Sequence, residues 1–273
     1  MLISIITVCF NETDNLLLTL KNISNLKNYF PFEYILIDGK SKQETIRIIK
    51  DFEHCIDKLV SEQDEGLFDA MNKGVKLASG SFVNFLNCGD VLTKKGMSAF
   101  NDFIINPKNN EYDVYYLDTL IKYRELIIKQ PKWSLNQIYK GMPFCHQSTF
   151  VKNKFLKKYP FDKLSLCGDF KFFTQLYVQG AKFKYIPEIG SIYQSGGVSE
   201  KNLKTSLKQK KEYIINLGYW REYEVEIFYR TKLLKANIRL ILKRILGESH
   251  FKFIESKIQC FKHEKGSDTY TSS

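Results

Sequence analysis

The stretch that decides the fold runs from Ser61 to Asp90 and reads SEQDEGLFDAMNKGVKLASGSFVNFLNCGD. It begins with an acidic loop, continues as a helix that starts near Gly66, and turns tightly at Ser79-Gly80. A buried strand, Ser81–Leu86, follows, and the acid Asp90 stands just beyond its end. Charged and amide groups at strand ends in an α/β pattern are how proteins build sites for polar, phosphorylated ligands. The stretch therefore predicts an α/β domain with such a site.

Strands and helices alternate along the first part of the chain. The other predicted strands are Leu2–Val8, Glu33–Asp38 and Lys58–Ser61, and the predicted helices are Asn11–Lys27, Lys42–Phe52, Phe68–Leu77 and Thr93–Phe103. This alternation predicts right-handed βαβ units in a mixed, mostly parallel, Rossmann-like sheet flanked by helices. Because ligands bind at the carboxyl ends of such strands, we expect the polar clusters at 7–11, 38–41, 61–66 and 87–90 to converge on one edge.

The second half reads as a mixture of strands and helices. Predicted strands are Tyr112–Asp118, Leu120–Lys129, Phe144–Val151 and Lys182–Ile186, the last of which should stop at Pro187. Asp169–Gln179 is predicted to be a helix closed by Gly180.

The last quarter of the chain is helical in pattern and strongly basic. Lys201–His263 holds 15 lysine and arginine residues and 6 glutamates, a net charge of +9 out of +11 for the whole chain. At helical spacing, Lys232, Lys235, Arg239 and Lys243 form one stripe, and Leu234, Ile238, Ile241 and Ile245 form the opposite one. A packed helix with a solvated basic face and a helix at an anionic membrane surface both fit this pattern. Nucleic-acid binding is not expected, because no recognition module accompanies the charge. We expect a domain over 1–200, a basic helical extension over 201–263 and a flexible tail over 264–273.

Cysteine usage and hydropathy indicate a cellular compartment. The six cysteines are scattered and none are at CxxC spacing, so neither a zinc site nor a disulfide framework is indicated. The apolar run Leu2–Phe10 has no basic segment before it, and no later uncharged stretch is long enough to span a membrane. We therefore expect the protein to stay in a reducing cytoplasm.

Several acids stand where they could do chemistry. Asp38 ends a strand, where its carboxylate can accept hydrogen bonds from a base or a ribose, although a turn-forming role also fits. Asp90 can help to hold a divalent cation together with phosphates and water, or can cap the following helix. Asp169 can act as a general base, or can simply favour the positive end of its helix. Asp69, Asn72 and Lys73 share one helix face; Lys73 can offset diphosphate charge or pair with Asp69.

These motifs resemble bacterial family 2 glycosyltransferases, in which "SE.D.G.YDAMNKG…A.G…FLN.GD" recurs. Thr7–Glu12 resembles the family's "P.YNE" strand end, although taken alone it is better explained as a strand end that runs into an Asn cap. Asp38, Gly39, Ser41 and Thr45 match the family's "DG.S.DGT" pattern without the later acid. Further along, His146-Gln147 resembles "HQ", Gly168-Asp169 resembles the "ED" segment, and Gly196-Gly197-Val198-Ser199 matches a late "GG.S" turn. The resemblance covers Ile3 to Ser199 and is most specific over residues 61–90.

The resemblance implies a GT-A-type fold and a role for each matching residue. Those implied to contact the donor nucleotide are Thr7, Phe10, Glu12, Asp38, Asp64, Gly66, Asn72, Lys73 and Asn87. Asp169 would be the catalytic base, His146 and Gln147 would lie on the acceptor side or position its helix, and the turn at 196–199 would form a flap beside the donor.

The cation site departs from the family pattern. Family members have Asp-x-Asp where this chain has Asn87-Cys88-Gly89, and only Asp90 remains acidic. The resemblance implies Mg²⁺ or Mn²⁺, with Asp90 as the metal ligand, and a single carboxylate predicts weak affinity until the donor supplies its phosphates.

The function that the resemblance implies is inverting, hexosyltransferase-like glycosyl transfer. A sugar would move from a nucleotide-diphosphate donor, a UDP-sugar, to a lipid-linked glycan at the inner face of the plasma membrane, in surface polysaccharide (O-antigen or capsule) biosynthesis. The missing acids keep open a catalytically idle nucleotide-sugar-binding or membrane-adaptor protein. A nucleotidyltransferase lacks support, because no glycine-rich phosphate loop follows the first strand. The sequence names neither the sugar, the acceptor nor the oligomeric state.

Overall fold

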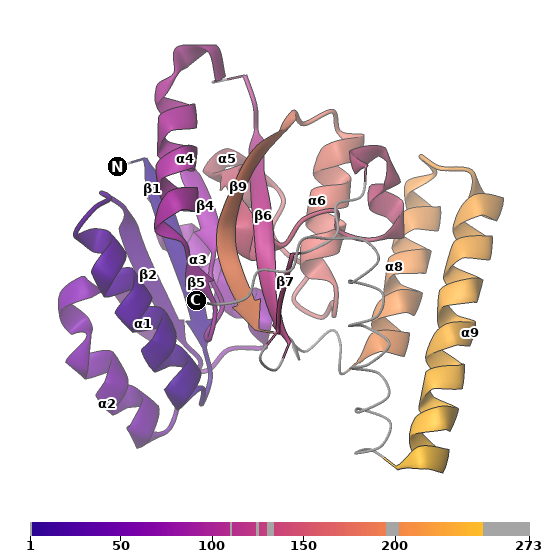
Figure 1. Cartoon of the computed structure of the whole chain (residues 1–273), viewed down its shortest axis with the longest axis horizontal. Helices are drawn as coiled ribbons and strands as arrows, with labels where there is room; N and C mark the ends of the chain where they lie inside the picture. The colour runs from indigo at the N-terminus through magenta and orange to yellow at the C-terminus, as the bar shows by residue number, and fades with distance from the viewer. Residues whose placement is uncertain (1, 110, 124–125, 130–133, 195–201, 248–273) are drawn as a thin grey trace.

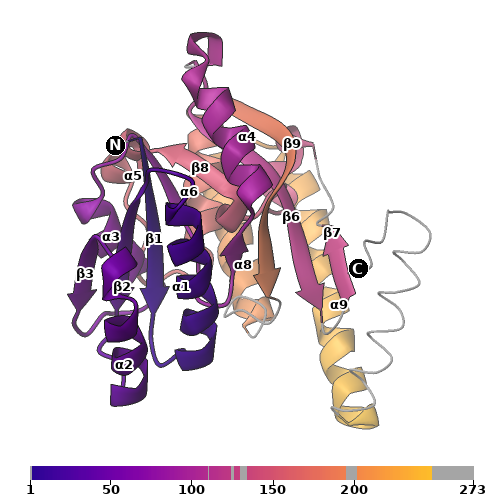
Figure 2. The same cartoon turned by 60° about the vertical axis from the view of Figure 1, so that its left-hand side comes forward.

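A computed structural model describes residues 2–109, 111–123, 126–129, 134–194 and 202–247. Nine strands form one mixed sheet in the order β3-β2-β1-β4-β8-β6-β9-β5, with β7 paired to β6 (Figures 1 and 2). The predicted α/β fold, a Rossmann-like sheet with helices on both faces, is confirmed.

The N-terminal half of the sheet is wholly parallel. It consists of β1 (Ile3–Cys9), β2 (Glu33–Asp38), β3 (Lys58–Ser61) and β4 (Phe82–Phe85). In the register, Cys9 lies opposite Asp38, Asp38 lies opposite Ser61, and Ile6 lies opposite Phe85. The carboxyl ends of these four strands therefore lie together, as predicted, and we call this the carboxyl edge.

Alternating side chains of these strands feed two cores. Ile3 and Ile5 of β1 pack with α1 (Thr13–Lys27), α2 (Gln43–Asp51) and α4 (Lys94–Ile105). Ile6 and Val8 face the other way and pack with α3 (Leu67–Leu77), α5 (Asn153–Lys158) and α6 (Gly168–Val178). A strand buried on both faces reads as a continuous apolar run, which is why the pattern was visible in the sequence.

The second half departs from the predicted boundaries in three places. Strand β6 (Val114–Tyr123) runs unbroken through the predicted gap at Thr119, and β7 (Leu126–Lys129) is shorter than expected. Strand β8 covers only Thr149–Lys152, because the preceding residues form the 3₁₀ turn η4 (His146–Ser148).

A further departure concerns Pro187. Strand β9 (Phe183–Gln194) does not stop there; its pairing with β6 skips from Ile186 to Ile189, so Pro187 faces no ladder partner in the bulge. A proline has no N–H to donate and is tolerated at such a point. The short β5 (Val91–Leu92) then pairs with β9. Three further 3₁₀ turns, η1 (Glu53–Cys55), η2 (Pro107–Asn109) and η3 (Leu135–Lys140), complete the described elements.

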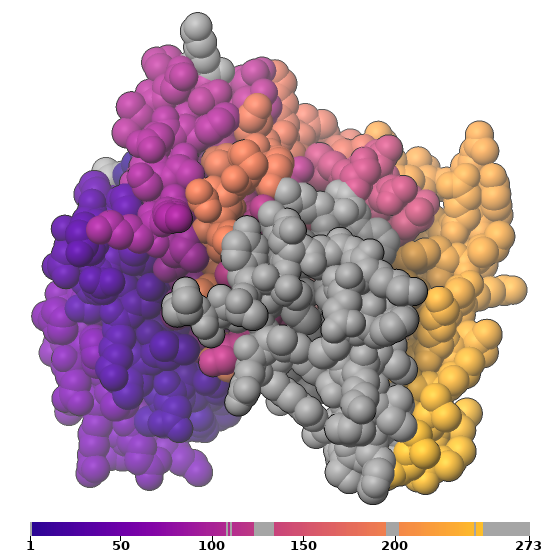
Figure 3. Space-filling view, in the orientation of Figure 1, coloured from indigo at the N-terminus to yellow at the C-terminus, as the bar shows by residue number. Residues whose placement is uncertain are grey.

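Two helices, α8 (Leu203–Leu217) and α9 (Glu222–Leu246), form the edge of the molecule opposite α1 and α2 (Figures 1 and 3). They attach through a small third core in which Ile214, Val225 and Tyr229 pack against Phe170 of α6. The Tyr229 hydroxyl also donates a hydrogen bond to the Tyr139 carbonyl at 2.8 Å. The predicted tail at 264–273 lies outside the described residues. Within the described residues, no helix is both long enough and apolar enough to span a bilayer.

Helix α9 turns its most apolar stripe away from the body. Tyr229 and Ala236 are buried, whereas Ile227, Leu234, Ile238, Ile241 and Ile245 on the opposite side are 47–72% exposed. We call these five residues the α9 ridge.

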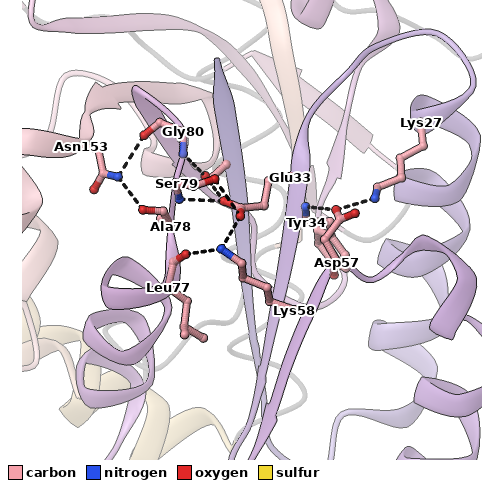
Figure 4. Close-up of polar contacts among 11 residues, drawn as sticks. Lys27, Glu33, Tyr34, Asp57, Lys58, Leu77, Ala78, Ser79, Gly80 and Asn153 are labelled. Atoms are coloured by element: carbon pink, nitrogen blue, oxygen red, sulfur yellow. Dashed lines mark hydrogen bonds and ion pairs between the residues drawn. The ribbon is translucent and has the colours of Figure 1, made fainter. Parts of the chain in front are cut away.

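A buried carboxylate ties the amino ends of the strands to the turn at Ser79-Gly80 (Figure 4). Glu33 pairs with Lys58 at 2.6 Å and accepts hydrogen bonds from the Ser79 backbone N–H and hydroxyl, both at 2.9 Å. The Ser4 hydroxyl also donates to Glu33 and accepts from the Gly80 N–H. A Cβ on Gly80 would lie 2.6 Å from the Ser4 nitrogen, so the turn requires glycine. Burial acts to raise the pKa of Glu33, but the bonds from Lys58, Ser4 and Ser79 outweigh it and lower the pKa to about 2.

We predict that Glu33→Gln lowers the free energy of unfolding by about 3 kcal/mol at pH 7, since a carboxyl pKa depressed on folding stabilises the folded state above its unfolded value. That contribution should be lost as the pH falls from about 4.5 towards 2, where both proteins carry an uncharged group. Urea unfolding at several pH values measures the difference. Glu44→Gln, at an exposed position on α2, is the control and should change stability by less than about 0.5 kcal/mol. A pH-independent gap between wild type and Glu33→Gln would contradict this.

Candidate active site

Asp38 is the fixed point of the carboxyl edge. Its carboxylate is buried and accepts hydrogen bonds from the Ser61 hydroxyl at 2.6 Å and from the Ser41 backbone N–H at 3.1 and 3.2 Å. Ser41 in turn accepts a bond from the Asn11 N–H, which joins the ends of β1 and β2. These bonds hold the Asp38 side chain in one position between three strand ends.

Phe10, Gly39 and Asp64 come together beside Asp38. A Cβ placed on Gly39 would lie 2.5 Å from Asp64 Oδ2 and 3.3 Å from the Phe10 ring, so both side chains press close to the glycine. Asp64 Oδ1 accepts the N–H of Gly66, which has φ of 122° and starts α3. The Phe10 ring is 60% exposed. An exposed ring next to two carboxylates offers a stacking surface and hydrogen-bond acceptors to a nucleoside.

Four predicted donor residues are buried or make contacts with other parts of the protein. Thr7 is fully buried within β1. Glu12 is exposed and accepts a hydrogen bond from Asn15 at 2.6 Å. Asn72 exchanges two hydrogen bonds, both at 2.9 Å, with the backbone of Phe161. Lys73 turns back to the acidic loop, where it contacts Glu62 at 2.8 Å, the Gln63 carbonyl at 2.9 Å and Asp69 at 3.5 Å.

Asn87, His146 and Asp169 form a hydrogen-bonded chain from the end of β4 to the start of α6. Asn87 Nδ2 lies 3.1 Å from His146 Nε2, and His146 Nδ1 lies 3.3 Å from Asp169 Oδ2. Asp169 Oδ1 also accepts its neighbour's N–H from Phe170 at 2.8 Å. The Asp169 side chain is 31% exposed, so a substrate hydroxyl can reach it.

The pKa of Asp169 is set by burial and by its neighbours. Burial acts to raise its pKa, but the hydrogen bond from His146 and the positive charge of Lys210 on α8 outweigh burial, so the net pKa is below its usual value. At neutral pH the group is therefore ionised.

Asp90 lies deeper and is held on both sides. It is 2% exposed, and it accepts hydrogen bonds from Gln147 Nε2 on Oδ2 and from the Gln194 N–H on Oδ1, both at 3.0 Å. Burial raises its pKa to about 6. No group of three or more His, Cys, Asp or Glu in the described ranges could hold a metal ion. A carboxylate keeps a second acceptor site on each oxygen, so Asp90 fits a cation as one ligand among several that a bound phosphate would supply.

The sequence singled out only some of the residues that hold the acids in place, namely Ser41, His146 and Gln147. Ser61 fixes Asp38, and Thr19 of α1 bonds both the Gly89 N–H and the Asp90 carbonyl. Gln194 contributes only its backbone N–H to Asp90, which no side-chain pattern could show. The glycine turn at 196–199, expected to form a flap, lies outside the described residues.

Known proteins resemble this chain in sequence and in fold. The model of the family described as "Glycosyl transferase family 2" matches residues 4–143, half of the chain. An uncharacterised glycosyltransferase of Methanocaldococcus jannaschii is 24% identical over 81% of this chain and 85% of its own length. The hyaluronan synthase of Pasteurella multocida is 35% identical over 89 residues, which cover 32% of this chain and 9% of the synthase.

Solved structures share the fold at low sequence identity. TarS residues 1–349 of S. aureus, solved with UDP-GlcNAc, has a TM-score of 0.62 at 17% identity, and the match covers 86% of this chain and 72% of the TarS chain. In another TarS structure, the match covers 43% of the TarS chain. The mannosyltransferase PcManGT of Pyrobaculum calidifontis, with GDP-Man and Mn²⁺, has a TM-score of 0.63 at 13% identity, covering 95% and 79%. With the family model matching half of the chain and these neighbours sharing its sheet, the chain belongs to glycosyl transferase family 2 and is a glycosyltransferase of the GT-A fold.

Proposed function

We propose that this glycosyltransferase transfers a sugar, with inversion, from a UDP-sugar to a lipid-linked glycan in surface polysaccharide biosynthesis. The observation that supports the proposal is the chain Asn87–His146–Asp169, which ends in an ionised, partly exposed carboxylate. Phe10 and Asp64 lie together beside Asp38 at the carboxyl edge, where they can contact a nucleoside. TarS, which shares the fold, is seen with UDP-GlcNAc, and this supports a UDP-sugar.

In the proposed reaction, Asp169 takes the proton from an acceptor hydroxyl while that oxygen forms a bond to the anomeric carbon. The bond from that carbon to the donor diphosphate breaks on the opposite face, and the nucleoside diphosphate leaves with the electron pair. Asp38 and Asp64 hold the nucleoside during this step. No covalent intermediate is needed, because attack and departure occur in one displacement.

The proposed cofactor is Mg²⁺ or Mn²⁺, held by the donor diphosphate with Asp90 as the protein ligand. Such a cation, when bound, neutralises negative charge that develops on the leaving diphosphate. PcManGT, a neighbour in fold, is seen with Mn²⁺ and GDP-Man, which supports the proposal. Because Asp90 is one buried carboxylate, the cation and the donor should bind together.

We predict that UDP binds more tightly with Mg²⁺ than with EDTA in calorimetry, and that Mg²⁺ alone gives no measurable heat at the same concentration.

Asp38→Asn and Asp64→Asn should each weaken UDP binding about ten- to a hundredfold, because a hydrogen bond to a charged group contributes about 1.5–3 kcal/mol. Exposed Asp102→Asn on α4 is the matched control and should bind normally. Equal affinity with Mg²⁺ and EDTA would remove the cation from the proposal; full affinity in both site variants would move the nucleoside site elsewhere.

We predict that Asp169→Asn binds donor normally but loses about 10²–10⁴-fold in kcat, because only the chemical step uses the base. Transfer from a panel of UDP-sugars to lipid-linked acceptors measures this. Near-normal turnover by the variant would exclude Asp169 as the base. Wild-type protein that binds UDP-sugars but transfers from none of them would instead support a catalytically idle nucleotide-sugar-binding protein, the second candidate that the missing Asp-x-Asp acids favour.

We also propose that the protein is peripheral at the inner, cytoplasmic face of the plasma membrane, with the extension 201–263 against anionic lipid. The α9 ridge is exposed on the face of the helix that is turned away from the body. Arg230 and Arg244 flank the ridge on one side, and Lys235 and Arg239 flank it on the other. An exposed apolar stripe with basic flanks is the arrangement of helices that lie in a membrane interface.

We predict that replacing Lys232, Lys235, Arg239 and Lys243 by Gln releases the protein from anionic liposomes at low salt, since each cation contributes about 1 kcal/mol near such a surface. Ile238→Ser with Ile241→Ser should release it too, and this loss should persist across salt concentrations, because salt screens only the charge term. The control replaces Lys21, Lys50, Lys76 and Lys95 by Gln, which removes the same charge from exposed positions on α1 to α4. Release of the control protein as well would reduce the effect to net charge. If the wild-type protein does not bind anionic liposomes at low salt, the proposed membrane contact is wrong.

A further inference from the structure

We propose that Asn87 and His146 are positioning residues that orient the carboxylate of Asp169 through a fixed imidazole tautomer, so that the end of β4 on the donor side sets the geometry of the base on α6. This inference rests on the proposed role of Asp169 as base. It concerns a link between two elements, because Asn87 follows β4 and Asp169 is in the first turn of α6.

The tautomer follows from the chemistry of the three groups. Asn87 presents its Nδ2, which can only donate, to His146 Nε2 at 3.1 Å. With the amide in this orientation, Nε2 is the accepting nitrogen, and a neutral imidazole carries its one proton on the other nitrogen. That nitrogen, Nδ1, lies 3.3 Å from Asp169 Oδ2, so its N–H points at the carboxylate. The bond from Asn87 to Nε2 therefore leaves the proton on Nδ1, from which it is donated to Asp169.

The surroundings favour this chain over alternatives. The His146 side chain is 15% exposed, so little water competes for its ring nitrogens. The other amide atom, Asn87 Oδ1, is buried and has no hydrogen-bond partner among the residues that the structure describes. The amide is therefore held by its bond to His146. With the Phe170 N–H on Oδ1 and His146 on Oδ2, both oxygens of Asp169 are fixed, and each keeps a lone pair for a substrate proton.

Asn87 also connects the base to the cation end of the site. The Asn87 carbonyl accepts the Asp90 N–H at 3.1 Å in the turn that Thr19 closes. A donor diphosphate that contacts Asp90 would therefore meet the same turn that presents the Asn87 amide to His146. The relay consists of Asn87, His146 and Asp169, and its charged neighbours are Lys210 on α8 and Asp90.

The test compares His146→Leu, His146→Asn, Asn87→Leu and the double variant His146→Leu/Asn87→Leu. His146→Leu should lower kcat about tenfold or more and leave the donor KM within about twofold, because the base loses its orientation while the donor contacts remain. Asn in place of His146 keeps an N–H donor near the Nδ1 position and should restore most of that loss. The double variant should be no slower than His146→Leu alone, since Asn87 acts only through His146.

A pH–rate profile separates positioning from a purely structural role. His146 lowers the pKa of Asp169, so removing it should move the acidic limb of the kcat profile to higher pH. His54→Leu, at an exposed position near α2, is the matched control and should move neither kcat nor the profile. Thermal melting checks that all variants are folded.

The outcomes distinguish the relay from the proposed function. An active Asp169→Asn would exclude the base itself. A dead Asp169→Asn with normal kcat and an unshifted limb in His146→Leu would leave the base in place and refute the relay. Additive losses in the double variant would show that Asn87 acts separately from His146, and would also refute it.

Discussion

Strand β1 pairs in parallel with β2 on one side and β4 on the other, and the polar groups of the carboxyl edge depend on that pairing. Parallel strands run in the same direction, so the loops that follow β1, β2, β3 and β4 all lie at the carboxyl edge. The chain then places an exposed ring, two carboxylates and an amide within four short loops. The sheet brings these loops together, and each loop turns through one residue with positive φ: Asn11, Lys40, Gly66 or Gly89.

Strand β2 carries a carboxylate at each end, and the two carboxylates are in different surroundings. Glu33 at the amino end is surrounded by cationic and neutral donors, so its charge is stabilised and it locks the Ser79-Gly80 turn. Asp38 at the carboxyl end accepts bonds from two serines that leave part of its hydrogen-bonding capacity unused. Asp38 can therefore still accept a hydrogen bond from a ligand at this edge. The Glu33 carboxylate, in contrast, is bound by partners that all belong to the protein itself.

Two acids that lie near each other are in opposite environments. Asp90 is buried among neutral donors, and its pKa rises to about 6, whereas Asp169 has His146 and Lys210 beside it and its pKa falls. In the proposed mechanism, the ionised acid takes the acceptor proton, and the buried one gains a partner when the cation and the donor bind. The glutamine that follows His146 bonds Asp90. Adjacent residues of η4 therefore hold both acids, and a shift of this turn would disturb both.

The sequence by itself determined the alternation of strands and helices, the convergence of four polar clusters and the family pattern at residues 61–90, because apolar periodicity and turn residues are local signals. Tertiary structure decided the rest. It let β9 continue past Pro187 by means of a bulge against β6, and it paired Asn72 with the distant backbone of Phe161 and Lys73 with the nearby Glu62. It also left the α9 ridge exposed, while Tyr229 and Ala236 took the buried side. It also brought Asn87, His146 and Asp169 into contact, although they are 59 and 23 residues apart along the chain. Hydrogen bonds between such distant residues depend on the register of strands and the direction of side chains, which no window of sequence contains.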